Sequence, residues 1–307
     1  MIERLMRIGG LAGVVLVGLL LLGASPVRAE AVQIKAGGLT VNGELKIADG
    51  RKLSDGVVLM VHGTLAHHAM ETITNLQSIL TERGYNTLAV SLSLGVDNRS
   101  GTYDCATPHR HRHTDALDDI SAWLDWLAGK GVKDVVLFGH SRGGNQAAWF
   151  ATERGSPMIK RMVLLAPATW DAERAATGYQ KLHKKPLQAS LAAAKALVAA
   201  GKGDAMIKGA GVLYCPGADA TAASVVSYLT PDPRLNTPTL LRNAKLPTLV
   251  IAGSADKVVS NLPETMAGIA DGKNIKLTVI ADANHYFLDL VAEDVADEIE
   301  AFHTPGG

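Results

Sequence analysis

The feature that most constrains this chain is a serine on a sharp corner, in the stretch "VVLFGHSRGG" at 135–144. An apolar run typical of a buried strand ends at Gly139, and a helical pattern begins directly after Ser141. With Gly143 the stretch fits G-x-S-x-G. Between a strand and a helix, this spacing predicts a turn so tight that side chains at the two glycine positions would collide, and it lifts the serine hydroxyl clear of the sheet.

The rest of the chain alternates short apolar runs with helical patterns, after an expected hairpin at 32–48. Alternation with short connections predicts an α/β fold in which helices cover both faces of a mostly parallel sheet. The predicted strands are 56–63, 85–92, 134–139, 161–168, 246–256 and 275–285, and the predicted helices are 70–83, 114–129, 142–154, 261–270 and 287–303.

Regular alternation stops near residue 169. Residues 170–208 are rich in Ala and Lys and predict helix, whereas 209–245 reads as a loop region with four prolines. The strand pattern resumes at 246. Residues 169–245 are therefore expected to be an insertion between two strands of one core, which is formed by residues 30–168 and 246–307.

The first 29 residues predict a secretory signal peptide. Arg4 and Arg7 precede an apolar run at 8–23, and small residues up to Ala29 follow at the positions that a signal peptidase reads. The run is shorter than the ~18–20 residues of a membrane-spanning helix. We therefore expect cleavage after Ala29, an exported protein that is periplasmic or fully secreted, and no stable membrane anchor after cleavage.

The charge balance and the cysteines indicate which partners the protein can bind and in which compartment it can work. The chain has 30 basic and 30 acidic residues, which gives it no electrostatic reason to bind nucleic acid or an anionic membrane surface. Cys105 and Cys215 lie in two predicted loops. An oxidising compartment permits a disulfide, and the sequence leaves open whether the two are bridged or are free thiols. The oligomeric state is open as well.

Two polar residues complete a catalytic set with Ser141. A serine hydroxyl needs a base to take its proton, and the base needs an acid to orient it. Asp256 and His285 each follow a predicted strand, at the carboxyl edge where open α/β sheets place their sites. Asp282 is the alternative acid, although it lies close to His285 in sequence. We expect a Ser141–His285–Asp256 triad.

An oxyanion formed at Ser141 needs hydrogen-bond donors. The backbone N–H of Arg142, at the start of a helix, is one candidate. The loop after the strand at 56–63 supplies the second, with Thr64 as the first choice and Leu65 as the alternative.

Together, "HG" at 62–63, "GHSRGG" at 139–144, "AGSAD" at 252–256 and "ANH" at 283–285 resemble the α/β-hydrolase superfamily from about residue 55 to the end. The resemblance implies an eight-stranded, mostly parallel sheet, a Ser-Asp-His triad and no cofactor. It also implies that residues 169–245 form a helical cap over the active site. A serine rather than an aspartate at position 141 departs from the haloalkane dehalogenases of that superfamily.

Histidines concentrate in two places outside the triad. His109, His111 and His113 alternate in the loop at 93–113, and His67 and His68 form a pair. Alternating histidines in a loop make an imperfect metal site, so no metal is predicted. Because it follows the carboxyl end of a strand, the loop is expected to line the substrate cleft; a solvated loop is the alternative.

These observations predict an exported serine hydrolase that cleaves a small or medium carboxylic ester. A thioesterase, an amidase or a lipase would use the same residues. A non-catalytic binding protein on the same scaffold is the alternative from a different class, and the complete set of nucleophile, base and acid argues against it.

Overall fold

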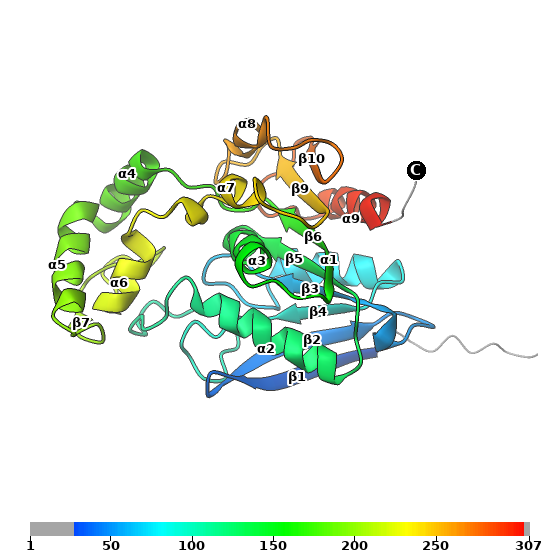
Figure 1. The fold of residues 1–307 in the computed structure, drawn as a ribbon, viewed down its shortest axis with the longest axis horizontal. Helices are drawn as coiled ribbons and strands as arrows, with labels where there is room; N and C mark the ends of the chain where they lie inside the picture. The colour runs from blue at the N-terminus through cyan, green and yellow to red at the C-terminus, as the bar shows by residue number, and fades with distance from the viewer. Residues whose placement is uncertain (1–27, 304–307) are drawn as a thin grey trace, which may run out of the picture.

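The computed structural model describes residues 28–303 of the chain. Within this range eight strands form one sheet, in the order β1-β2-β4-β3-β5-β6-β9-β10 (Figure 1). β2 is antiparallel to both β1 and β4, and all other neighbours are parallel, which confirms the predicted mostly parallel sheet. The bounds are β1 Arg28–Ala36, β2 Leu39–Ile47, β3 Val57–Val61, β4 Thr87–Val90, β5 Val135–His140, β6 Ile159–Leu165, β9 Thr248–Gly253 and β10 Ile275–Ile280.

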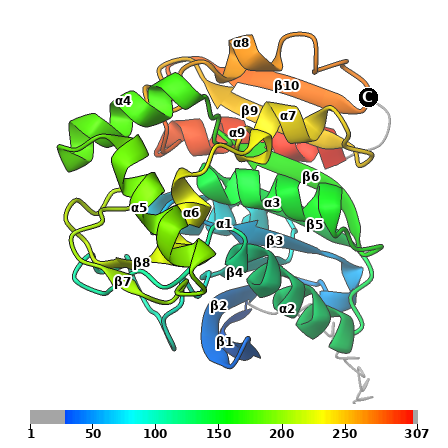
Figure 2. The same cartoon turned by 60° about the vertical axis from the view of Figure 1, so that its left-hand side comes forward.

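Helices cover both faces of the sheet, as the alternating pattern predicts. α1 packs with α9, and α3 packs with α2 and α7. Figure 2 shows these two groups on opposite faces. The bounds are α1 Glu71–Glu82, α2 Asp115–Gly129, α3 Arg142–Glu153, α7 Thr237–Leu241, α8 Leu262–Met266 and α9 Leu290–His303, with a 3-10 turn at Leu53–Asp55.

The central strands are apolar because both of their faces are covered. Every residue of β3, β5 and β9 is buried. The predicted runs 56–63, 246–256 and 275–285 extend past the observed ends of β3, β9 and β10. The extra residues form the loops at the carboxyl edge of the sheet, and those loops carry the polar side chains that the site needs.

A group of helices inserted after β6 stands apart from the sheet, on the left of Figure 1. We call residues 169–229 the cap. It has its own hydrophobic cluster, which includes Tyr179, Leu191 and Val225. Its elements are α4 Ala172–His183, α5 Leu187–Ala199, β7 Met206–Ile207, β8 Ala220–Thr221 and α6 Ala222–Leu229.

The expectation of a loop region at 209–245 is wrong in part, because α6 and α7 form there. The side chain of Thr221 caps α6 by accepting a hydrogen bond from the N–H of Ser224, and buried Val225 faces the cap cluster. Pro238 lies in the first turn of α7, where proline is compatible with a helix. After the 3-10 turn Pro233–Leu235, this last part of the insertion packs on the core rather than in the cap.

The base of the cap is joined to the loop at 93–113. Cys105 and Cys215 form a disulfide. Beside it, His109 pairs with β8, since its N–H donates to the carbonyl of Asp219 at 2.8 Å and its carbonyl accepts from the N–H of Thr221 at 2.9 Å. The cap is thus attached both covalently and by backbone hydrogen bonds.

The predicted signal peptide lies almost entirely outside the described residues, which begin at Arg28. The expected cleavage point after Ala29 falls within the exposed first residues of β1. Between residues 28 and 303, no helix combines the length and the apolar character needed to cross a membrane.

Candidate active site

Ser141 lies between the end of β5 and the start of α3, in the strained backbone conformation that a sharp corner requires. Its φ is 55° and its ψ is −122°, a region that non-glycine residues rarely occupy. This conformation costs of order 1–3 kcal/mol, and hydrogen bonds to neighbouring backbone groups stabilise it. The N–H of Ser141 donates to the carbonyl of Leu165, and its own carbonyl accepts from the N–H of Ala168, both at 2.9 Å.

The glycines around Ser141 are required by close backbone approaches. A Cβ added to Gly139 would lie 2.5 Å from the carbonyl oxygen of Gly143. A Cβ added to Gly143 would collide with the carbonyl oxygen of His62 and lie 2.8 Å from that of Val61. The second clash is with the end of β3, so Gly143 is what allows α3 to start so close to the neighbouring strand.

Ser141, His285 and Asp256 are brought together from the ends of three strands. The Nε2 atom of His285 lies 3.0 Å from Oγ of Ser141, and its Nδ1 lies 2.8 Å from Oδ2 of Asp256. All three side chains are buried to more than nine-tenths. Such a line of hydroxyl, imidazole and carboxylate can transfer the serine proton to the imidazole and stabilise the resulting charge.

The environment of Asp256 favours a carboxylate. Burial raises the pKa of Asp256, but the hydrogen bond from His285 and those from the backbone N–H groups of Val259 and Val258 outweigh it, so the pKa lies below its ordinary value. The two amides donate to Oδ1 at 3.0 and 2.7 Å. The alternative acid, Asp282, is exposed and makes no hydrogen bond to His285.

His140, next to Ser141, makes a contact that the sequence does not predict. Its Nε2 donates to the backbone carbonyl of His285 at 2.9 Å, and the two rings lie in a tilted contact at a centroid distance of 5.0 Å. Burial, and then the neighbouring His285, lower the pKa of His140 to about 4, so it stays neutral. His140 therefore helps to fix the loop that presents the base. The only sequence signal was its place next to Ser141.

The proposed oxyanion donors lie in two adjacent turns. Thr64 and Leu65 follow β3, and neither has a hydrogen bond from its backbone N–H to any other described residue. Arg142 is the first residue of α3, so its N–H has no partner within the helix. Nε of Arg142 donates to Oγ1 of Thr64 at 3.2 Å, which ties the two turns together. The structure leaves both Thr64 and Leu65 available as the second donor.

His62 holds the turn after β3 in place. Its Nδ1 donates to the carbonyl of Gly63 at 2.7 Å, and its Nε2 accepts from the N–H of Leu92 at 3.0 Å and from Arg99 at 3.2 Å. Burial, and then the charge of Arg99, lower the pKa of His62 well below its ordinary value. A neutral His62 is therefore part of the support for this turn.

The histidines of the loop at 93–113 are buried, so the solvated-loop alternative is wrong. His111 bonds to the hydroxyl of Tyr228 through Nδ1 at 2.7 Å and to His109 through Nε2 at 3.1 Å. His113 contacts Arg142. No residue of this loop lines the cavity described next, so the expectation that the loop lines the substrate cleft is wrong for this cavity as well. His67 and His68 are half-buried, and residues 28–303 contain no cluster of His, Cys, Asp or Glu suited to a metal ion.

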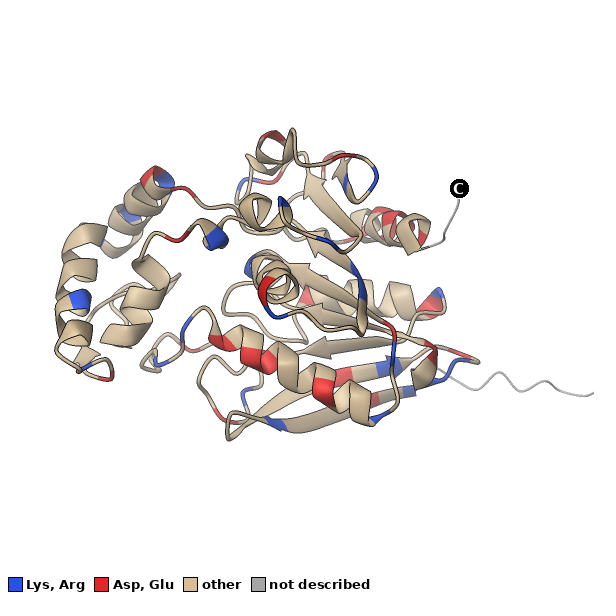
Figure 3. Cartoon of the chain, in the orientation of Figure 1, with Lys and Arg blue, Asp and Glu red and all other residues tan. Residues whose placement is uncertain are grey.

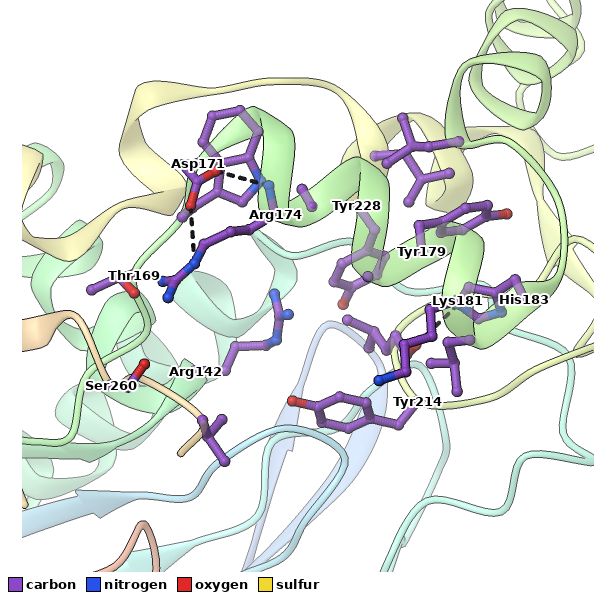
Figure 4. Close-up of a pocket in the computed structure, with 18 of the residues that line it drawn as sticks. Arg142, Thr169, Asp171, Arg174, Tyr179, Lys181, His183, Tyr214, Tyr228 and Ser260 are labelled. Atoms are coloured by element: carbon purple, nitrogen blue, oxygen red, sulfur yellow. Dashed lines mark hydrogen bonds and ion pairs between the residues drawn. The ribbon is translucent and has the colours of Figure 1, made fainter. Parts of the chain in front are cut away.

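A cavity of about 730 Å³ lies between the cap and the carboxyl edge of the sheet (Figure 4). We call it the cap cavity. Ser141 and His285 do not line it, but Arg142 and Lys257, each next in sequence to a triad residue, do. Tyr214 and Tyr228 contribute from the cap side. The cavity is therefore lined by residues that adjoin the triad in sequence.

Comparisons with known proteins agree with this architecture. The sequence model of the family described as "Alpha/beta hydrolase family" matches residues 58–298. Among solved structures, Est1E from Butyrivibrio proteoclasticus is 21% identical, with 89% of this chain and 96% of that chain covered and a TM-score of 0.62. The esterase Pf2001 of Pyrococcus furiosus is 19% identical, with 90% of each chain covered and a TM-score of 0.59.

A dienelactone hydrolase from Anabaena variabilis is 18% identical, with 90% of this chain and 96% of that chain covered and a TM-score of 0.52. At these identities the likeness shows a shared fold. No curated protein matches the chain in sequence.

Proposed function

The chain belongs to the alpha/beta hydrolase family, and on that premise we propose that it hydrolyses carboxylic esters through an acyl-enzyme formed on Ser141. The observation that carries the proposal is the hydrogen-bonded line from Asp256 through His285 to Ser141, with distances of 2.8 and 3.0 Å. Esterases among the structures of the same fold support an ester as the substrate.

In the first half of the reaction, Oγ of Ser141 attacks the acyl carbonyl carbon while Nε2 of His285 takes the hydroxyl proton. The carbonyl oxygen becomes an oxyanion, which accepts hydrogen bonds from the backbone N–H groups of Arg142 and of Thr64 or Leu65. Asp256 stabilises the imidazolium. His285 then gives its proton to the alcohol oxygen, the ester C–O bond breaks, and the alcohol leaves an acyl group on Ser141.

In the second half, water replaces the alcohol. His285 takes a proton from the water as its oxygen attacks the acyl-enzyme carbonyl, and a second oxyanion forms at the same donors. Collapse of this intermediate breaks the bond to Oγ of Ser141, which regains the proton from His285. The carboxylic acid leaves and the enzyme returns to its starting state. The partner is thus a small ester and water, with no cofactor in either step.

A Ser141→Ala variant tests the proposal. It should lose nearly all hydrolysis of p-nitrophenyl esters, by more than about 10⁴-fold, while circular dichroism and the melting temperature show a retained fold. A fluorophosphonate probe should label the wild-type protein at Ser141 and leave the variant unlabelled. Undiminished turnover by the variant would remove Ser141 as the nucleophile, and a protein that neither turns over esters nor reacts with the probe would be a binding protein.

A series of p-nitrophenyl esters of increasing chain length, run beside a matched thioester and a matched anilide, separates the related activities. We expect the highest kcat/KM on short or medium esters. A maximum on long chains would instead identify a lipase, and a maximum on the thioester or the anilide would identify a thioesterase or an amidase with the same triad.

We also propose that the protein is exported after removal of residues 1–29. The disulfide between Cys105 and Cys215 supports this location, because such bonds persist in oxidising compartments. Expression in a bacterial host followed by N-terminal sequencing of the periplasmic and medium fractions should give a chain that begins at Glu30. Recovery of the intact chain from the cytoplasm alone would contradict the proposal.

A further inference from the structure

Arg142 presents a positive charge inside the cap cavity. Figure 4 shows its guanidinium pointing into the cavity, between Arg174 on one side and Tyr228 on the other. The chain places it there because Arg142 directly follows the nucleophile and begins α3. The cavity therefore holds a cation from the residue next in sequence to the nucleophile.

The guanidinium is held only by neutral groups. Nε donates to Oγ1 of Thr64 at 3.2 Å, Nη1 contacts Nδ1 of His113 at 3.3 Å, and the ring of Tyr228 lies 5.8 Å from Cζ. Nη2 makes no hydrogen bond to any described residue, and no carboxylate between residues 28 and 303 forms an ion pair with Arg142. Burial lowers the pKa of Arg142, yet a guanidinium keeps its charge in a protein.

Hydrogen bonds behind Arg142 fix the orientation of His113, and burial keeps its ring neutral. Nε2 of His113 donates to Oδ1 of Asn145 at 3.0 Å, and Nδ2 of Asn145 donates to the carbonyl of Arg234 at 2.9 Å, which fixes the orientation of the amide. Nδ1 of His113 is then an acceptor that faces Arg142. Burial, and then Arg142 itself, lower the pKa of His113 to about 3. The histidine positions the arginine and adds no charge to the site.

Basic and acidic residues are both spread over the described chain (Figure 3), but basic residues predominate on the cavity wall. Four lining residues are Lys or Arg and one is acidic, namely Asp171. This carboxylate caps α4 by accepting from the N–H of Arg174 at 2.8 Å, and it lies 3.7 Å from the guanidinium of the same residue. Asp171 is therefore paired with Arg174 and does not neutralise Arg142. Lys181 and Lys257 are exposed and lie at the rim of the cavity.

Arg99 provides an internal contrast, because it is a second arginine near the site and is fully buried, whereas Arg142 is half-buried. Its Nε and Nη2 donate to the carbonyl of Leu92 at 3.1 and 2.7 Å, and its Nη1 donates to the carbonyl of Gly101. Nη2 also contacts His62. Every nitrogen of Arg99 has a partner in the protein. Arg142 differs because its Nη2 has no partner among the described residues and its guanidinium points into the cap cavity (Figure 4).

We propose that Arg142 is the carboxylate-binding residue of the cap cavity, and that the substrates are esters that carry a carboxylate group in addition to the ester. This rests on the proposed function. A carboxylate matches the two parallel N–H donors that a guanidinium offers from Nη1 and Nη2. It would also neutralise a half-buried cation that the protein leaves without a counter-ion among the described residues. The hydroxyl groups of Tyr228 and Tyr214 lie on the same wall (Figure 4).

Two pairs of substrates test the proposal and locate the carboxylate. The acyl pair is the mono-p-nitrophenyl ester of adipic acid against p-nitrophenyl hexanoate, which has the same chain length. The alcohol pair is 4-carboxybenzyl butyrate against 4-methylbenzyl butyrate. We expect kcat/KM to be at least about tenfold higher for the carboxylate member of one pair, the range that a hydrogen-bonded charge supplies. A ratio near one in both pairs would overturn the proposal.

Variants of Arg142 then assign the preference to its side chain. In Arg142→Gln the preference for the carboxylate member should fall by about tenfold, whatever the change in the neutral rate, and Arg142→Lys should restore part of it. As a matched control, Lys181→Gln removes a charge at the exposed rim. Its effect on the ratio should stay below about threefold and fade in ~0.5 M salt, because exposed charges are screened. A preference that survives Arg142→Gln would overturn the assignment.

A binding measurement separates this proposal from the proposed function. Adipate should bind to the Ser141→Ala protein, as followed by calorimetry, and the additional change Arg142→Gln should weaken it about tenfold. Equal hydrolysis of both members of each pair, abolished by Ser141→Ala, would retain the esterase and overturn the carboxylate site. If hydrolysis survives Ser141→Ala while adipate binding depends on Arg142, the carboxylate site would be retained and the proposed serine esterase overturned.

Discussion

The sheet core and the cap are built in different ways, and the difference separates chemistry from selectivity. All six residues of β5 are buried, and Ser141, just after its end, is fixed by backbone hydrogen bonds to Leu165 and Ala168. In α5 only Leu187, Leu191 and Ala194 of thirteen residues are buried. A region with few buried contacts opens more easily than the core. The reacting groups therefore lie on the rigid part, and the cap shapes the cavity that receives the substrate.

The two regions meet at the loop that contains the buried histidines. The N–H of His113 donates to Oγ of Ser227, and Nδ1 of His111 bonds to the hydroxyl of Tyr228, both in α6. The disulfide joins the same loop to the cap. Changes in the core should therefore abolish turnover or folding, whereas changes at this junction should alter substrate binding and stability.

The largest expected effect is on the core side, in Asp256→Asn. The amide cannot stabilise the imidazolium form of His285, and it favours the wrong tautomer, so kcat should fall by about 10⁴-fold. Steady-state kinetics on a neutral ester measures it, with the melting temperature as the check on folding. The matched control is Asp282→Asn, the alternative acid, which is exposed and should keep normal kcat. Similar losses in both variants would contradict the assignment of the acid.

Glycine-to-alanine changes give a second contrast between the two regions. Gly143→Ala places a methyl group against the carbonyl of His62 and should destabilise the protein by about 3 kcal/mol or more. Gly178 lies within α4 of the cap with no atom within 4 Å of an added Cβ. Gly178→Ala should therefore stabilise its helix by about 0.5–1 kcal/mol. Urea unfolding measures both, and opposite signs are expected; a mild effect at Gly143 would refute the close approach.

The features of the core that the sequence predicts are those set by local composition or by a rule of the fold. Strands such as β3 and β5 are short apolar runs because the sheet is covered on both faces, so local composition identifies them. The glycine spacing around Ser141 is equally local. Asp256 and His285 could be placed beside Ser141 because parallel strands end at one edge. In each case a rule of the fold converts sequence position into spatial position.

The features that were missed depend on contacts between distant parts of the chain. The sequence does not indicate α6 because its two adjacent valines favour helix only weakly, and the helix is stabilised by packing in the cap cluster. The burial of His111 depends on Tyr228, 117 residues further along the chain. Which donors of Arg142 remain free depends on Thr64 and His113. No local pattern reports such contacts.

Loss of the disulfide should have the next largest effect on stability, because the bond joins the cap to the loop at 93–113. Cys105 and Cys215 are 110 residues apart, so the bond restricts a long loop in the unfolded chain. The double variant Cys105→Ser/Cys215→Ser should lower the free energy of unfolding by about 2–4 kcal/mol. Because the bond anchors the base of the cap, KM should rise more than kcat falls. Reduction of the wild-type protein should reproduce the change, and a collapse of kcat alone would show that the bond supports the core instead.

The smallest expected effect is the response of the junction to acid. Burial, and then the charges of His109, Arg99 and Arg142, lower the pKa of His111 to about 3, whereas an unfolded histidine has a pKa of about 6.5. Between these values the unfolded chain binds a proton that the folded chain does not. The contribution of His111 to stability is thus complete above pH ~6.5 and is lost as the pH falls below that value.

Replacing His111 isolates this contribution. Below pH ~6 the dependence of unfolding free energy on pH should be shallower in His111→Gln than in the wild type, by close to 1.4 kcal/mol per pH unit. The slope is the readout because loss of the bond to Tyr228 shifts the whole curve without changing its steepness. Urea titrations from pH 7 to 5 measure it. Parallel curves would mean that the folded protein also takes up the proton, so that acid does not weaken the junction through this residue.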